Sequence, residues 1–215
     1  MIRMRKATIS SGKDNSIKSI IEEKNAEIVV KKSKFIASIF KVENKEQAGQ
    51  ALESVRKKYF DAKHNCYVYR VSEDGTIVER ASDDGEPSGT AGAPMLDILK
   101  KNDIVNVLIV VTRYFGGILL GTGGLVKAYS DSTKLAIENS GLRDVEIGDR
   151  VIYTISYDNI QKLQYICNKN NIKIENIEYG ENILVNVIAI KEKVNLIDNS
   201  IDILNKDILE DNVIF

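Results

Sequence analysis

A glycine-rich stretch contains the residues of this chain that are best suited to binding a ligand. Its centre, from Thr112 to Tyr129, holds five glycines. Backbone next to glycine can approach a ligand closely, and cations beside it attract negative charge. We therefore interpret this stretch as a candidate site for an anion. Its candidate binding residues are Arg113, Tyr114, Gly116, Gly117, Thr122, Gly123, Gly124 and Lys127.

The glycine spacing argues against hydrolysis of a nucleotide. Gly116 and Gly121 have the spacing of a phosphate-binding loop, but Thr122 and Gly123 stand where lysine and then serine or threonine should follow. The spaced glycines of a dinucleotide-binding fold cannot be fitted either. Two interpretations stay open: a site for phosphate or a nucleic-acid backbone, and glycines that only let a helix pack closely on a sheet.

A second group of candidates lies in an acidic loop over residues 81–94. The loop contains both prolines of the chain and three acids, Asp83, Asp84 and Glu86. Loops of this length inside a compact domain usually have a function. The three carboxylates could hold a divalent cation or act as an acid–base pair. The alternative is a solvated turn that also caps a helix expected from Met95 to Lys101.

The only histidine, His64, stands two residues before Cys66 in a segment with strand alternation. A thiol and an imidazole can form a nucleophile and its base, but no third group that would orient the imidazole is evident. No further cysteine or histidine stands in this half of the chain, which argues against zinc. We favour a hydrogen-bonding role for His64 and predict no metal and no cofactor.

A strand and a helix must position the glycine-rich stretch. Residues 105–111 are β-branched and almost wholly apolar, which predicts a strand buried on both faces. After the glycines, apolar residues recur at helical spacing, and Gly141 offers a C-terminal cap. This helix would direct its N-terminus, with its partial positive charge, at the strand end where Arg113 and Lys127 lie.

The rest of the first half predicts further strands and one helix. Strands are expected over residues 27–30, 35–42, 62–71 and 77–78, and a helix is expected to follow an N-cap at Asn44. Three lysines, Lys31, Lys32 and Lys34, separate the first two strands. We interpret them as a solvated turn, with phosphate contact as the alternative. Residues 1–18 are interpreted as a mobile leader or as a short helix through Ile17, Ile20 and Ile21.

Composition indicates an ordinary globular protein of two domains. The chain has 215 residues, of which 43% are hydrophobic and 28% charged, as in soluble domains. Residues 1–145 carry 23 lysines and arginines against 19 acids, whereas the remainder carries 7 against 12. This asymmetry would place a polyanion on the first half. We divide the chain into a leader (1–26), a first domain (27–145) and a second domain (146–215).

Nothing in the sequence indicates secretion or a membrane. The first twenty residues lack the apolar core of a secretion signal. No segment approaches the roughly 20 apolar residues that a membrane-spanning helix needs. The two cysteines have no metal-ligand spacing and fall in different halves, so a cytoplasmic location is expected.

The second half has a regular order of elements. Strands are expected over residues 151–157, 172–179, 183–190 and 208–214, and helices over residues 159–170 and 192–203. The resulting order, strand-helix-strand-strand-helix-strand, is typical of a ferredoxin-like domain. This half contains no evident catalytic constellation.

Three blocks of the sequence together resemble the IMPACT/YigZ family. They are the loop from Asp83 to Gly92, the turn from Arg113 to Gly117 and the segment from Leu120 to Tyr129. The strand start at His64 fits as well. The resemblance is close over about residues 27–141, and the remainder resembles the small C-terminal domain of bacterial members.

The resemblance implies an α+β fold in two domains. The first would be a βα sandwich like the second domain of small ribosomal-subunit protein five and domain IV of elongation factor G. The second would be a ferredoxin-like βαββαβ domain. Eukaryotic members restrain an amino-acid-starvation kinase and so regulate translation, with the help of an additional N-terminal interaction domain. For this chain the resemblance implies a cytoplasmic, translation-linked or nucleic-acid-binding role.

Our leading hypothesis is a non-enzymatic protein that binds RNA, a ribosomal surface or a translation-linked protein. Arg113, Lys127 and the turn amides would contact phosphate, and Tyr114 would stack on a base. The second hypothesis is an enzyme acting on a small phosphorylated or carboxylated substrate over the same turn. Its catalytic groups would be His64, Asp83, Asp84 and Glu86. The third is a pure protein-interaction module.

Overall fold

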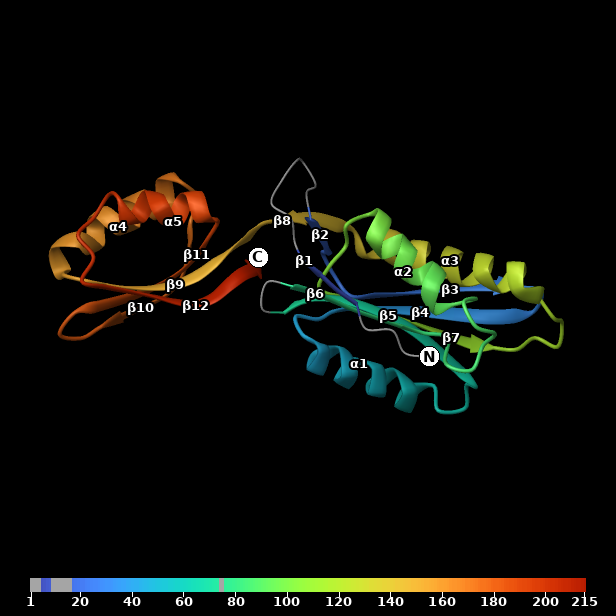
Figure 1. Ribbon diagram of the computed structural model, residues 1–215. Helices are drawn as coiled ribbons and strands as arrows, with labels where there is room; N and C mark the ends of the chain where they lie inside the picture. The colour runs from blue at the N-terminus through green and yellow to red at the C-terminus, as the bar shows by residue number, and fades with distance from the viewer. Residues whose placement is uncertain (1–4, 9–16, 74–75) are drawn as a thin grey trace. The chain divides into compact units, whose positions relative to one another are not determined.

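The computed structural model describes residues 5–8, 17–73 and 76–215. The chain forms two compact units, Met1–Val145 and Glu146–Phe215 (Figure 1). Within the described residues each unit combines strands with helices, so the predicted mixed α/β, two-domain architecture is confirmed.

The first unit contains eight strands and three helices among its described residues. They are β1 (Arg5–Thr8), β2 (Ile17–Ile20), β3 (Lys24–Val30), β4 (Ser33–Lys41), α1 (Lys45–Lys58), β5 (His64–Glu73), β6 (Thr76–Ser82), α2 (Gly92–Lys101), β7 (Val107–Tyr114), α3 (Gly121–Ser140) and β8 (Leu142–Val145). Six strands form an antiparallel sheet in the order β1-β6-β5-β7-β4-β3.

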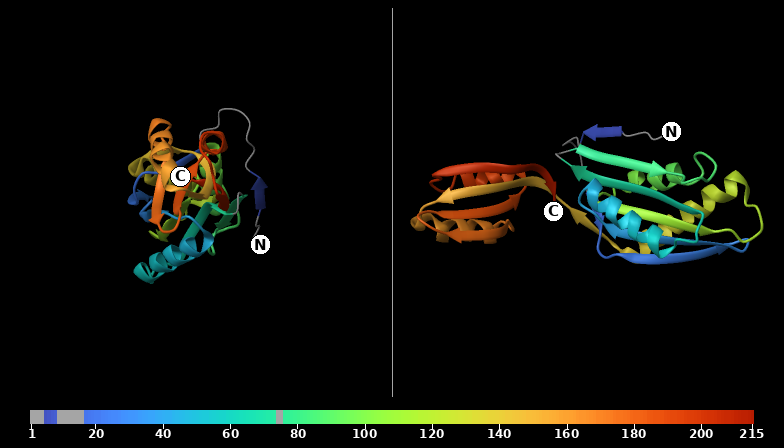
Figure 2. Two further views of the ribbon diagram at one scale, coloured as in Figure 1. Left: turned by 90° about the vertical axis from the view of Figure 1, so that its left-hand side faces the viewer. Right: turned by 90° about the horizontal axis from the view of Figure 1, so that it is seen from below.

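Helices cover both faces of this sheet. Helix α1 lies on one face, where Figure 2 shows it crossing the strands, and α2 and α3 cover the other (Figure 1). The side chains of β7 alternate between these layers: Leu108 and Val110 pack toward α1, and Ile109 and Val111 pack toward α2 and α3. The prediction of a strand buried on both faces is therefore confirmed.

The predicted ends of two helices are confirmed by their hydrogen bonds. Asn44 Oδ1 accepts from the Gln47 N–H at 2.8 Å at the start of α1. Gly141 ends α3 with a φ of 63°, a conformation that glycine adopts easily. Both caps depend only on residues that are neighbours in the sequence, so they can be predicted from the sequence alone.

The helix predicted through Ile17, Ile20 and Ile21 is wrong. Residues 17–20 form β2, which pairs with β8, and the Ile20 side chain is fully buried. A strand partner so distant in sequence decides the structure here, and isoleucine suits a strand. The predicted mobile leader falls mainly on residues 1–4 and 9–16, which lie outside the described residues. Of the rest of residues 1–26, the described part contributes β1, β2 and the start of β3.

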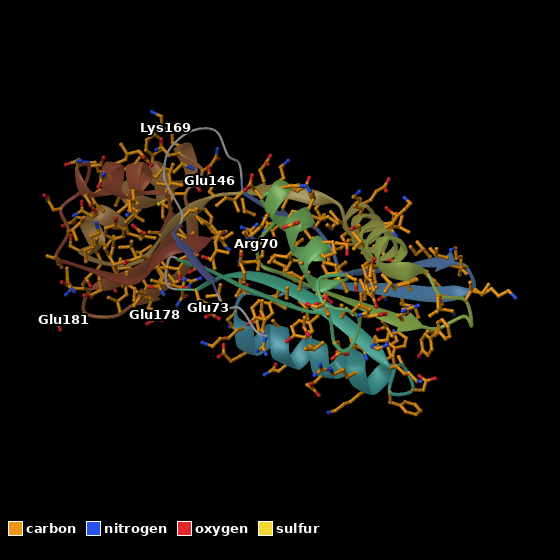
Figure 3. The ribbon with its side chains drawn as sticks, turned by 45° about the vertical axis from the view of Figure 1, so that its right-hand side comes forward. Arg70, Glu73, Glu146, Lys169, Glu178 and Glu181 are labelled. Atoms are coloured by element: carbon orange, nitrogen blue, oxygen red, sulfur yellow. The ribbon has the colours of Figure 1, made fainter. Side chains whose placement is uncertain are left out.

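A buried ion pair ties α2 to the sheet. Arg70 on β5 donates to Glu79 on β6 at 3.0 Å, and its Nη1 also donates to the Ile104 carbonyl at 2.9 Å (Figure 3). Lys100 of α2 approaches the other oxygen of Glu79 at 2.7 Å. These contacts involve none of the candidate site residues.

The second unit repeats the predicted order of elements. They are β9 (Ile147–Ile155), a 3-10 turn at Tyr157–Asn159, α4 (Ile160–Lys169), β10 (Lys173–Tyr179), β11 (Ile183–Ala189), α5 (Lys191–Asp198) and β12 (Asn205–Ile214). The antiparallel sheet has the order β10-β11-β9-β12, and both helices lie on one face of it (Figure 1).

Candidate functional site

The acidic loop and the glycine-rich stretch meet through Glu86. One carboxylate oxygen of Glu86 accepts from Arg113 Nη1 at 2.6 Å and from the Tyr129 hydroxyl at 2.8 Å. Glu86 is 8% exposed and Arg113 is 7% exposed. The loop, the end of β7 and the first turns of α3 therefore share one buried polar centre.

Arg113 is enclosed by aromatic rings as well as by Glu86. Its guanidinium lies 5.5 Å from the Phe35 ring centre and 5.6 Å from that of Phe115. Arg113 Nε is buried and has no hydrogen-bond partner. Glu86 neutralises the guanidinium inside the protein, so Arg113 offers a phosphate no uncompensated charge while this ion pair is intact.

Tyr129 completes this centre, and the sequence reasoning did not select it. Its ring packs edge-on against Phe35 with 5.2 Å between ring centres. Burial, followed by the neighbouring Cys66 and Glu86, raises the pKa of Tyr129. A tyrosine on the apolar stripe of a helix requires a partner for its hydroxyl, and that signal could have pointed to it.

Asp83 holds the acidic loop and caps α2. Its carboxylate accepts from the backbone N–H groups of Gly89, Ala91 and Gly92 at 2.8, 2.9 and 2.9 Å. Ala91, at the start of α2, has no side chain that could cap the helix. The Asp83 carboxylate, from the preceding loop, accepts the N–H hydrogen bonds there instead. The alternative of a capping turn fits this residue.

Asp84 anchors the loop to β5 and α1. Its carboxylate accepts from the Asn65 N–H at 2.7 Å and from Arg56 at 3.2 Å. Its backbone carbonyl lies 2.9 Å from His64 Nδ1. A carbonyl oxygen only accepts, so Nδ1 carries the proton in this arrangement. His64 therefore has the hydrogen-bonding role that the sequence favoured.

The thiol of Cys66 is unsuited to nucleophilic attack. Cys66 is fully buried, and its Sγ donates to the Asp83 carbonyl at 3.0 Å. Burial raises the pKa of this thiol, and nearby carboxylates act in the same direction. Within the described residues no three side chains of histidine, cysteine, aspartate or glutamate are grouped to hold a metal ion. The carboxylates considered for a cation have other partners in this structure: Asp83 and Asp84 accept from backbone N–H groups, and Glu86 accepts from Arg113.

The glycines have separate tasks. A Cβ at Gly116 would lie 2.0 Å from the Lys32 carbonyl carbon, so this glycine allows the turn to touch the β3–β4 hairpin. Gly117 and Gly121 have φ values of 84° and 72°, where other residues are strained. Gly123, in contrast, has open space around it.

The N-terminus of α3 faces solvent. Gly121, Thr122 and Gly123 are exposed, Gly124 is half-buried, and no side chain caps the helix. Lys127 is exposed and pairs with Asp131 one turn later at 3.0 Å. Such an exposed pair contributes little energy, so the Lys127 ammonium is available to a ligand.

Tyr114 lies at the end of β7 but is held by a neighbour. Its hydroxyl donates to Asp61 at 2.7 Å, and this hydrogen bond raises the pKa of Tyr114 to about 12. The contact joins the α1–β5 connection to β7. The ring of the next residue, Phe115, is 56% exposed while also lying over Arg113, and the sequence reasoning did not select it.

Comparison with known proteins identifies the family. The chain is 38% identical to the IMPACT family member YvyE of Bacillus subtilis over 158 residues, which cover 73% of this chain and 72% of that protein. This chain belongs to the IMPACT family. Residues 31–137 match the Impact N-terminal domain, and residues 154–190 match a domain of unknown function. The resemblance drawn from the sequence is thereby confirmed.

Two further relatives of the IMPACT chain extend the likeness. YigZ of Escherichia coli is 35% identical over 159 residues, which cover 74% of this chain and 78% of that protein. The chain is also 32% identical to a hypothetical protein of known crystal structure. The two structures match with a TM-score of 0.63 over 85% of this chain and 89% of that protein's chain. No described helix is long and apolar enough to cross a membrane.

Proposed function

We propose that this IMPACT-family protein is a cytoplasmic, translation-linked factor that binds RNA or a ribosomal surface without catalysing a reaction. The polar centre carries this proposal. Glu86, Asp83, Asp84 and His64 are each bonded within the protein. The uncapped start of α3 and Lys127 remain open to solvent. The groups that sequence analysis proposed for catalysis are thus engaged in holding the protein together. The surface beside them, at the start of α3, offers N–H groups and an ammonium to phosphate.

The finer fold assignments belong to the same proposal. The order β10-β11-β9-β12, with both helices on one face, supports a ferredoxin-like second unit. We assign the first unit to the fold of domain IV of elongation factor G and of the ribosomal protein named above. Folds that occur on the ribosome are consistent with a ribosomal or RNA partner.

The unequal charge of the two halves supports contact through the first unit. Residues 1–145 have an excess of basic residues, and residues 146–215 have an excess of acidic ones. Glu178 and Glu181 of the second unit are both exposed (Figure 3). Because RNA is a polyanion, the second unit would repel it and the first would attract it.

The enzyme hypothesis has less support than binding. Its four groups do gather near the turn, but a general base must be free to take a proton. The three carboxylates are held by N–H, hydroxyl or guanidinium donors. His64 donates Nδ1–H to a carbonyl, which leaves Nε2 as its basic nitrogen, so His64 is the one group of the four on which an enzyme would rest. Turnover of a phosphorylated substrate that is lost in His64→Ala, with the fold intact, would favour the enzyme instead.

Affinity purification of the full chain from cytoplasmic extract tests the proposal. We expect RNA to co-purify at low salt and to be lost as salt rises, because phosphate contacts release counterions. Ribonuclease treatment is the control that separates RNA from protein partners. A protein that retains the same partners after ribonuclease and at high salt would contradict RNA binding and favour the interaction module.

A further inference from the structure

Three segments of the first unit meet at one end of its sheet. They comprise residues 30–33, 57–63 and 114–120, and we call them the tip. The backbone of Gly116 packs directly on that of Lys32. The Tyr114 hydroxyl donates to Asp61 at 2.7 Å, which joins the other two segments. The 114–120 segment therefore contacts the hairpin turn on one side and the α1–β5 connection on the other.

The tip is strongly basic. It contains five lysines, Lys31, Lys32, Lys57, Lys58 and Lys63, and a single acid, Asp61. Asp61 is hydrogen-bonded to Tyr114, and among the described residues none of the five ammonium groups has an ion pair. All five side chains are exposed, but Lys58 lines a pocket with Glu23 and Ser38 toward the start of β3. Lys31, Lys32, Lys57 and Lys63 therefore supply the charge of the tip that no ion pair neutralises.

Two phenylalanines project from the same tip. Phe60 is 85% exposed and Phe115 is 56% exposed. The strand order β5-β7-β4-β3 puts Phe60 near β5, Phe115 at the end of β7 and the Lys31–Lys32 turn beyond β4. Phe115 thus stands between two groups of lysines.

The Lys31–Lys32 turn has an unusual sequence for its conformation. Val30 pairs with Ser33, so the two lysines form a two-residue hairpin loop, and their φ values are 45° and 65°. Turns with two positive φ values normally carry Asn-Gly or a similar pair. A turn selected for stability alone would therefore not contain two lysines. Their position puts both charges at the outermost point of the hairpin.

We propose that the tip binds unpaired RNA, with bases stacked on Phe60 and Phe115 and phosphates held by the flanking lysines. The inference rests on the proposed function and deepens it. Exposed rings stack on bases only when the bases are free of a duplex. Lysines on both sides of Phe115 suit a strand in which phosphates alternate with bases. Ile118 and Leu119 add exposed apolar surface, so an anionic membrane or a protein partner is tested as a competing occupant.

Fluorescence anisotropy of the full chain with a labelled, unstructured RNA of about 12 nucleotides tests the inference. Phe60→Ala/Phe115→Ala should weaken binding by about tenfold or more and leave the salt dependence unchanged, because stacking releases no counterions. Lys31→Asn/Lys32→Gly should weaken binding and lower the log–log salt slope by about 1.4, or 0.7 for each phosphate contact. This second variant suits the turn conformation, so loss of binding would not reflect unfolding.

Matched controls place the effect at the tip. Tyr165→Ala removes an aromatic ring that is 63% exposed and lies 5.8 Å from the Lys169 ammonium in the second unit. Lys41→Ala/Lys101→Ala removes two exposed lysines outside the tip. Both control variants should bind the RNA as the unchanged chain does.

The outcomes separate the inference from the proposed function. Binding of RNA that the tip variants leave intact would overturn the inference but leave the proposed function standing. No binding of this RNA by the unchanged chain would overturn the inference, whereas the proposed function would fall only if neither RNA nor ribosomes co-purified with the chain at low salt. Binding to vesicles of phosphatidylcholine and phosphatidylserine that the tip variants abolish, or stronger binding to the matching RNA duplex, would also overturn the inference.

Discussion

Glu86 and Arg113 form a buried ion pair, 2.6 Å long, between the acidic loop and the end of β7. Both residues were selected from the sequence as ligand-binding groups, and in the structure they bind each other. Since Tyr129 donates to the same oxygen of Glu86, the pair also fixes α3. Glu86, Arg113 and Tyr129 thereby connect the acidic loop, the end of β7 and α3, next to the residues that form the tip.

Removing one partner of this pair should destabilise the fold. Glu86→Gln leaves the Arg113 charge buried without a counterion, so we expect a loss of about 3 kcal/mol in the free energy of unfolding, measured by urea denaturation. Glu53→Gln, which removes an exposed partner of Arg56, should cost less than about 1 kcal/mol. Equal effects of the two substitutions would contradict the role given to Glu86.

Two glycines of the same stretch should respond oppositely to alanine. A Cβ at Gly116 would overlap the Lys32 backbone at 2.0 Å, so Gly116→Ala should destabilise the protein by at least about 2 kcal/mol. Gly123 lies in the first turn of α3 with open space around it, so Gly123→Ala should be neutral or stabilise by up to about 1 kcal/mol. Thermal unfolding of both variants is the measurement. A tolerated Gly116→Ala would show that the turn does not pack on the hairpin.

The hairpin lysines should reduce stability. Replacing them by the pair that the turn prefers, Lys31→Asn/Lys32→Gly, should raise the free energy of unfolding by about 1 kcal/mol. Lys41→Ala, at the opposite end of β4, should leave the free energy within about 0.5 kcal/mol. A decrease in stability on introducing Asn-Gly would show that the two lysines are well suited to the turn.

The buried thiols should make the fold sensitive to alkaline pH. Burial raises the pKa of Cys66, and it raises that of Cys167 to about 11. An unfolded thiol ionises near pH 8.5, so the contribution of these groups is fully present below that pH. Above it, only the unfolded state releases protons, and stability should fall by up to about 1.4 kcal/mol per pH unit for each thiol.

Urea denaturation between pH 7 and 10 measures this effect. Cys167→Ala should make the free energy of unfolding fall less steeply with pH, because one thiol no longer ionises in the unfolded state. This change in steepness is independent of any effect of the substitution on stability at pH 7. A slope that is the same with and without Cys167 would contradict burial of that thiol in the second unit.

The sequence predicted the elements whose signals are local. The apolar run of β7, the cap at Asn44, the C-terminal glycine of α3 and the order of the second unit all come from neighbouring residues. Each is decided by periodicity or by a cap, and each is found in the structure.

The features that the sequence did not predict depend on distant partners. Glu86 and Arg113 were both predicted to bind a ligand, but no residue near either of them in the sequence indicates that they bind each other. Ile17 to Ile20 become a strand only because β8 is available. Lys31 and Lys32 carry no signal for positive φ, since that conformation normally points to Gly, Asn or Asp. Tertiary contacts decided all three cases.

The salt dependence of RNA affinity for the unchanged full chain tests the central claim most directly. With about four lysines of the tip in contact with phosphate, the logarithm of the association constant should fall linearly with the logarithm of salt concentration, with a slope of about −3. An affinity that stays constant between about 50 and 200 mM salt, or no binding at the lower concentration, would contradict the claim that this protein binds RNA.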